Sequence, residues 1–128
     1  MSESNVEIVR RIFEYWQRGD FSYSDYWDED IDFDMVDWPA SARSRGVPAM
    51  ADTWRTSLGA WENFPSFPTE FVDCGDKVLV LNHIEARGRE SGVDVSAETA
   101  SVFTFRDGKV VRLALLWDVD AARREAEG

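Results

Sequence analysis

Several features that mark particular protein classes are scarce or absent in this sequence. Its single cysteine, Cys74, cannot form an internal disulfide, and its single histidine belongs to no H-x-x-x-H or Cys-His cluster of the kind that binds zinc. The sequence has no G-x-S-x-G elbow and no phosphate-binding glycine loop, which argues against serine hydrolases and nucleotide enzymes. We therefore expect no metal ion and no other cofactor.

A membrane segment and an excess of basic residues are also lacking. The chain has no charged-then-apolar leader and no run of about 18 apolar residues, so we expect a cytoplasmic protein. Its 14 basic residues are outnumbered by 25 acidic ones, which gives a net charge of −11. Such a surface repels phosphate backbones and anionic membranes, so neither nucleic acid nor a membrane is an expected partner.

The chain is expected to form one domain, residues 1–128, because no internal repeat, linker or low-complexity segment divides it. Ser4 and Glu7 form an S-x-x-E capping box ahead of the first helix. The elements expected in the first half are a helix over residues 5–18, a short helix over 23–27, an alternating strand over 31–35 and a helix from 48 to 64.

The second half is expected to consist of antiparallel strands. Asp107 and Gly108 lie between two apolar runs, and Asp-Gly in that position is a strong hairpin signal because both turn residues take a positive φ. The expected strands cover residues 69–73, 77–90, 97–106 and 109–118. Helices followed by such strands predict an α+β fold in which a curved sheet wraps over helices.

Four segments carry a resemblance to a known family: IVRRIFEYWQRGD at 8–20, DIDFDM at 30–35, SRGVPAMADTW at 44–54 and FTFRDGKVVRLALLWD at 103–118. With this order of elements, the chain resembles the SnoaL-like and ketosteroid isomerase-like branch of the nuclear transport factor 2-like superfamily. The resemblance implies a cone-shaped, cystatin-like fold, with a curved, mostly antiparallel sheet packed on helices around a deep apolar pocket. These segments mark the fold and not a reaction, so function depends on the residues in the pocket.

Ketosteroid isomerases place a tyrosine, an aspartate base and a protonated aspartate in this pocket. The resemblance puts those three positions at Ile12, Met35 and Ser101, so we expect no ketosteroid isomerase activity. Asp37 shares the inward parity of Met35 and is a candidate base instead. The alternative is that the acidic residues around this strand form a solvated face.

SnoaL-like polyketide cyclases use an acidic residue with a nearby histidine, and the matching residue types here are Asp118 and His83. His83 alternates with Asn82 along its strand, and only one strand face lines a pocket, so His83 lies either in the pocket or on the outer surface. Asp118 either faces the pocket or caps a helix that begins near Asp120.

Strand alternation and helical spacing predict the apolar lining of the pocket and its polar hydroxyl. These residues are Phe13, Trp16, Phe33, Met35, Trp54, Leu58, Ser101, Phe103 and Trp117. A wide aromatic lining fits a hydrophobic small molecule, aromatic or polycyclic. Two functions stay open: a cyclase, isomerase or hydratase that uses acid-base catalysis, and a non-catalytic ligand-binding or dimerisation module.

The strand from residue 77 has apolar residues at consecutive positions from Val78 to Leu81, so both of its faces are apolar. Residues 110–116 repeat this pattern. Because the pocket and its helices cover one face, we predict that a homodimer formed through the sheet covers the other.

Overall fold

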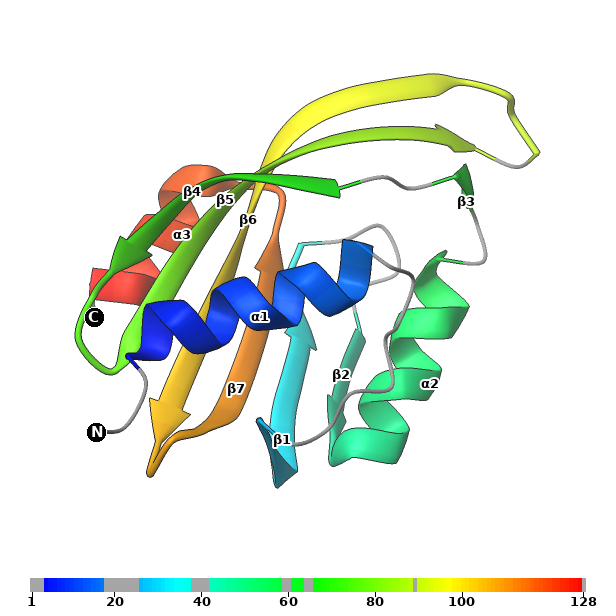
Figure 1. Cartoon of the computed structure of the whole chain (residues 1–128). Coiled ribbons are helices and arrows are strands. Elements are labelled where there is room, and N and C mark those ends of the chain that lie inside the picture. Colours follow the sequence, from blue (N-terminus) through cyan, green and yellow to red (C-terminus); the bar gives the residue numbers. More distant parts are fainter. Residues whose placement is uncertain are drawn as a thin grey trace.

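The computed structural model describes residues 4–17, 26–37, 42–58, 61–63, 66–88 and 90–127, and it shows one curved sheet with helices on both faces (Figure 1). The elements in chain order are α1 (Asn5–Gln17), β1 (Trp27–Met35), β2 (Ala42–Arg45), α2 (Val47–Leu58), β3 (Trp61–Asn63), β4 (Ser66–Asp73), β5 (Lys77–Gly88), β6 (Asp94–Arg106), β7 (Lys109–Leu116) and α3 (Val119–Glu127). This confirms the expected α+β class.

The seven strands form a single mixed sheet in the order β2-β1-β7-β6-β5-β3, with β4 also paired to β5. Strands β1 and β7 run parallel, and the other neighbouring pairs are antiparallel. β5 and β6 are the longest strands, and they arch over α1 in Figure 1. The sheet therefore has a concave face, which holds α1, and an opposite outer face.

Local sequence signals account for the elements that the sequence predicted correctly. The Ser4 hydroxyl accepts a hydrogen bond from the Glu7 backbone N–H at 3.2 Å, which begins α1 as the capping box predicts. Asp107 and Gly108 have φ angles of 53° and 78°, which confirms the hairpin turn between β6 and β7. The alternation of β1 is also confirmed, because the odd positions 31, 33 and 35 are buried.

Other elements differ from the sequence prediction. Trp27, expected at the end of a short helix, is instead the first residue of β1 and is buried; residues 23–25 lie outside the described part. The helix expected from 48 to 64 ends at Leu58, and residues 61–63 form strand β3, which pairs with β5. Strand β2 was not predicted. β2 has the sequence ARSR, with no apolar alternation, and it is a strand because it pairs with β1 from Asp32 to Met35.

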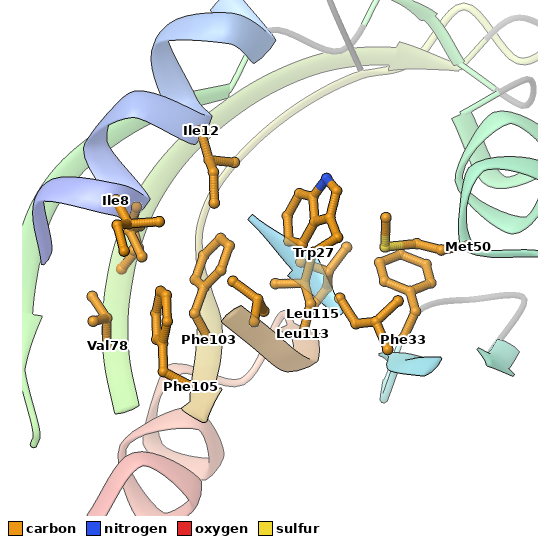
Figure 2. Close-up of a cluster of buried hydrophobic side chains, with 14 of the residues drawn as sticks. Ile8, Ile12, Trp27, Phe33, Met50, Val78, Phe103, Phe105, Leu113 and Leu115 are labelled. Carbon is orange, nitrogen blue, oxygen red and sulfur yellow. The ribbon is translucent and has the colours of Figure 1, made fainter. Parts of the chain in front are cut away.

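The concave face carries the larger apolar cluster. Ile8 and Ile12 project from α1 toward the sheet, and Met50 projects from α2 toward Phe33 (Figure 2). The Trp27 ring stacks on Phe103, with ring centroids 6.4 Å apart and an interplanar angle of 16°. This cluster fixes both helices to one face of the sheet.

The outer face is covered by α3, which packs across β5, β6 and β7 (Figure 1). Ala122 and Ala126 of this helix are buried against a second apolar cluster. The strand residues of that cluster are Leu79, Ala100, Val102, Ala114 and Leu116. The homodimer was predicted because the second face of the sheet needed a cover, and α3 covers the part of that face formed by these residues. The homodimer itself stays a prediction.

Ion pairs around Arg112 join α3 to the sheet beside this second cluster. The Arg112 guanidinium donates to Asp32 at 2.8 Å, to Asp34 at 3.2 Å and to Glu125 of α3 at 2.8 Å. Arg43 also pairs with Asp32, and its hydrogen bond is the main cause that holds the pKa of Asp32 below its ordinary value. Strands β1, β2 and β7 and the last helix therefore share one charge network. None of the helices within the described ranges is long and apolar enough to cross a membrane.

Replacing Arg112 by methionine is predicted to lower the free energy of unfolding by about 2–3 kcal/mol, because three half-buried carboxylates lose a shared cation. Urea denaturation of both proteins measures this difference. Arg55→Met is the matched control, since the Arg55–Asp52 pair is three-quarters exposed, and its removal is expected to cost less than about 0.5 kcal/mol. Equal losses in the two variants would show that the Arg112 network does not anchor α3.

Candidate functional site

Three buried polar side chains lie together on the concave face of β5 and β6. Asn82, Thr99 and Ser101 are 3%, 6% and 5% exposed. Asn82 is paired in register with Thr99, and Ser101 with Val80, which places all three on the face of the larger apolar cluster. The Asn82 amide Nδ2 donates to the Ser101 hydroxyl at 3.3 Å. This polar group lies in an otherwise apolar surface.

Where the structure describes it, the predicted apolar lining lies on the same face as this polar group. Phe13, Phe33, Met35 and Phe103 belong to the concave cluster, and Trp117 packs against it half-buried. Phe13 meets Phe103 edge-on, with ring centroids 6.0 Å apart. The side chains of Trp16, Trp54 and Leu58 lie outside the described part, so their predicted places in the lining stay predictions.

His83 lies on the outer face, away from this group. It alternates with Asn82 along β5 and is paired in register with Glu98. Its Nδ1 is 2.7 Å from a Glu98 carboxylate oxygen, and its Nε2 is 3.5 Å from Glu85. Of the two places that the sequence left open for His83, the structure supports the outer surface, where the imidazole cannot reach a ligand on the concave face.

The two candidate carboxylates bind backbone N–H groups. Asp37, exposed in the turn after β1, accepts hydrogen bonds from the backbone of Trp117 at 2.7 Å and of Asp118 at 2.9 Å. Asp118 accepts from the backbone N–H of Ala121 at 3.1 Å and so caps α3, the alternative that the sequence left open. Asp37 thus fixes the end of β7 beside β1, and Asp118 starts the last helix.

The three positions that correspond to the catalytic groups of ketosteroid isomerases are buried in this protein, and their side chains carry no charge. Ile12 is 2% exposed and Met35 is fully buried, both in the concave cluster, and neither side chain can transfer a proton. Ser101 lies among the polar group described above. Among the residues that the structure describes, no three histidine, cysteine or carboxylate side chains come together as metal ligands.

Sequence reasoning missed Asn82, Thr99 and Trp27 as members of this face. The signal for Asn82 was present, because it is the one amide in β5, follows the apolar run from Val78 to Leu81 and shares the parity of Val78 and Val80. Trp27 was missed because it was assigned to a helix. Parity alone divides β5 into two sets of residues, and the position of α1 decides which set faces inward.

Comparison with known proteins identifies similar sequences and folds. A family model described as the SnoaL-like domain matches residues 9–113. An NTF2-like protein from Burkholderia thailandensis has a TM-score of 0.84 at 18% identity, with 99% of each chain covered. TerC, co-crystallised with polyporic acid, has a TM-score of 0.77 at 18% identity, over 97% of this chain and 98% of TerC.

A suggested polyketide cyclase from Sinorhizobium meliloti is 27% identical, with a TM-score of 0.65, over 85% of this chain and 93% of that one. No curated protein matches the chain. The structural likenesses confirm the nuclear transport factor 2-like fold that the sequence resemblance implied.

The ion pair of His83 predicts a pH dependence of stability. The hydrogen bond to Glu98 is the main cause that raises the pKa of His83 above its ordinary value of 6.5. Because this pKa is raised in the folded protein, the ion pair of His83 stabilises the fold fully below pH 6.5. The contribution is lost as the pH rises through the raised pKa of His83. His83→Gln is expected to remove this slope, so urea denaturation from pH 5 to 9 should show the largest difference between the two proteins at the acid end. A constant difference over that range would contradict the assignment.

Proposed function

Because the chain belongs to the SnoaL-like domain family, we propose that it binds a hydrophobic small molecule, aromatic or polycyclic, against the concave face of its sheet. The family shares its fold with polyketide cyclases. The neutral polar group formed by Asn82, Thr99 and Ser101 supplies the hydrogen bonds, and the aromatic cluster around it supplies the apolar contacts.

The observation that carries this proposal is the burial of an amide and two hydroxyl side chains in the middle of an apolar face. Burying an uncharged polar group costs free energy unless it is fully hydrogen-bonded, so a face that serves only as a core favours apolar residues here. A few polar groups within an aromatic lining are typical of small-molecule sites. The arrangement therefore supports ligand binding over simple packing.

Two similar proteins support the same class of ligand. TerC was crystallised with polyporic acid, and the Sinorhizobium meliloti protein is a suggested polyketide cyclase. The two likenesses cover 97% and 85% of this chain. We take polyporic acid as the first compound to test.

Acid-base catalysis of the cyclase, isomerase or hydratase type is the second candidate function. It requires a titratable group at the ligand, and Asp37 lies next to Trp117, at the edge of the concave cluster. Its carboxylate already accepts two backbone hydrogen bonds that fix its orientation. If the protein converts a bound ligand, and Asp37→Asn loses this turnover but still binds the ligand, acid-base catalysis by Asp37 is favoured.

Filling the space beside Ser101 tests the proposed binding site. Ser101→Leu is predicted to weaken binding of polyporic acid and of naphthalene at least about tenfold, because the larger side chain occupies the face that the ligand covers. Isothermal titration calorimetry measures both affinities. The melting temperature of the variant shows whether the added volume has disturbed the fold.

Ser96→Leu is the matched control for this experiment. Ser96 is on the same strand but faces outward, where it is exposed and paired in register with Glu85. Its substitution should leave both affinities unchanged. If neither compound binds the unmodified protein, or if the two variants lose affinity equally, the concave face is not the binding site.

A further inference from the structure

The amide of Asn82 is hydrogen-bonded at one end only. Its Nδ2 donates to the Ser101 hydroxyl at 3.3 Å and lies 3.5 Å from the backbone oxygen of Val80. Its Oδ1 is buried and accepts no hydrogen bond from any residue that the structure describes. The side chain as a whole is 3% exposed. The protein thus holds an unused acceptor inside its apolar concave face.

The hydrogen bond to Ser101 sets the direction of this acceptor. With Nδ2 turned toward the Ser101 hydroxyl, the planar amide turns Oδ1 away from it. The Ser101 oxygen accepts this bond, so its own proton is left to donate. The pair therefore offers one acceptor and one donor to a molecule on the concave face.

A buried acceptor without a partner destabilises the free protein, because it has lost its hydrogen bonds to water and gained none. The cost is recovered when a ligand supplies a donor. An apolar ligand such as an unsubstituted ring system cannot do this, whereas an O–H group on the ring donates to Oδ1 and its oxygen can accept from the Ser101 hydroxyl. The site thus distinguishes two ligands of almost the same shape.

We propose that Asn82, positioned by Ser101, is the specificity-determining residue of the site and selects aromatic ligands that carry a hydroxyl group, such as phenols and enols. The inference rests on the proposed function, since it assumes that the ligand lies on the concave face. It assigns Asn82 a role in recognition and no role in a chemical step.

The test compares naphthalene with 1-naphthol, which differ by one hydroxyl group. The unmodified protein is expected to bind 1-naphthol about tenfold more tightly by isothermal titration calorimetry. In Asn82→Leu this preference should disappear, because leucine has a similar size but no acceptor. Without ligand, the variant should melt about 4 °C higher, since the unpaired acceptor is gone. Asn82→Val, which is smaller and suits a strand, provides the same comparison if leucine disturbs the fold.

His83→Gln is the matched control, because His83 is the next residue on β5 but faces outward and pairs with Glu98. It should keep the tenfold preference. If both compounds bind the unmodified protein equally, or if Asn82→Leu keeps the preference or melts lower, Asn82 is structural and the inference is wrong while the binding site stands. If neither compound binds, the proposed function fails, and the inference fails with it.

Discussion

Apolar side chains on both faces of β5, β6 and β7 are the constraint that determines where the helices lie. Val78 and Val80 belong to the cluster under α1, whereas Leu79 between them belongs to the cluster under α3. Because successive strand residues point to opposite faces, such a sheet is stable in water only when both faces are covered. The first and last helices meet this need from opposite sides, and α2 extends the cover over β1 and β2 (Figure 1).

The contacts of α3 show how a short, polar helix is held on such a face. Its buried residues, Ala122 and Ala126, are small, so the helix approaches the sheet closely but buries little apolar area. Arg112 adds ion pairs to the small apolar contact of the alanines. It binds Glu125 of the helix and Asp32 of β1, which is 80 residues away in the sequence. Burial opposes the charge of Arg112, but hydrogen bonds with Glu125 and Asp32 outweigh it and raise the arginine's pKa. The parallel pairing of β1 with β7 brings these groups together.

The sequence predicted the elements whose signals are local, and it left open those that depend on distant partners. The turn at Asp107 and Gly108 and the alternation of β1 follow from backbone preference and burial alone, and both were predicted. β2 exists because β1 is beside it, so its own four residues could not reveal it. In the same way, alternation separated Asn82 from His83, but only the positions of α1 and α3 show which of the two faces the concave cluster.

The distribution of charge limits the chemistry that the concave face can support. The described ion pairs of Arg43, Arg112, His83 and Arg87 lie on the outer face or along its exposed strand ends, on a chain whose net charge is −11. The buried polar residues described on the concave face, Asn82, Thr99 and Ser101, are an amide and two hydroxyls, which carry no charge. On such a face an aromatic hydroxyl gains both contact area and a hydrogen bond. The ligand recognition that we propose for this face therefore rests on shape and on the direction of single hydrogen bonds.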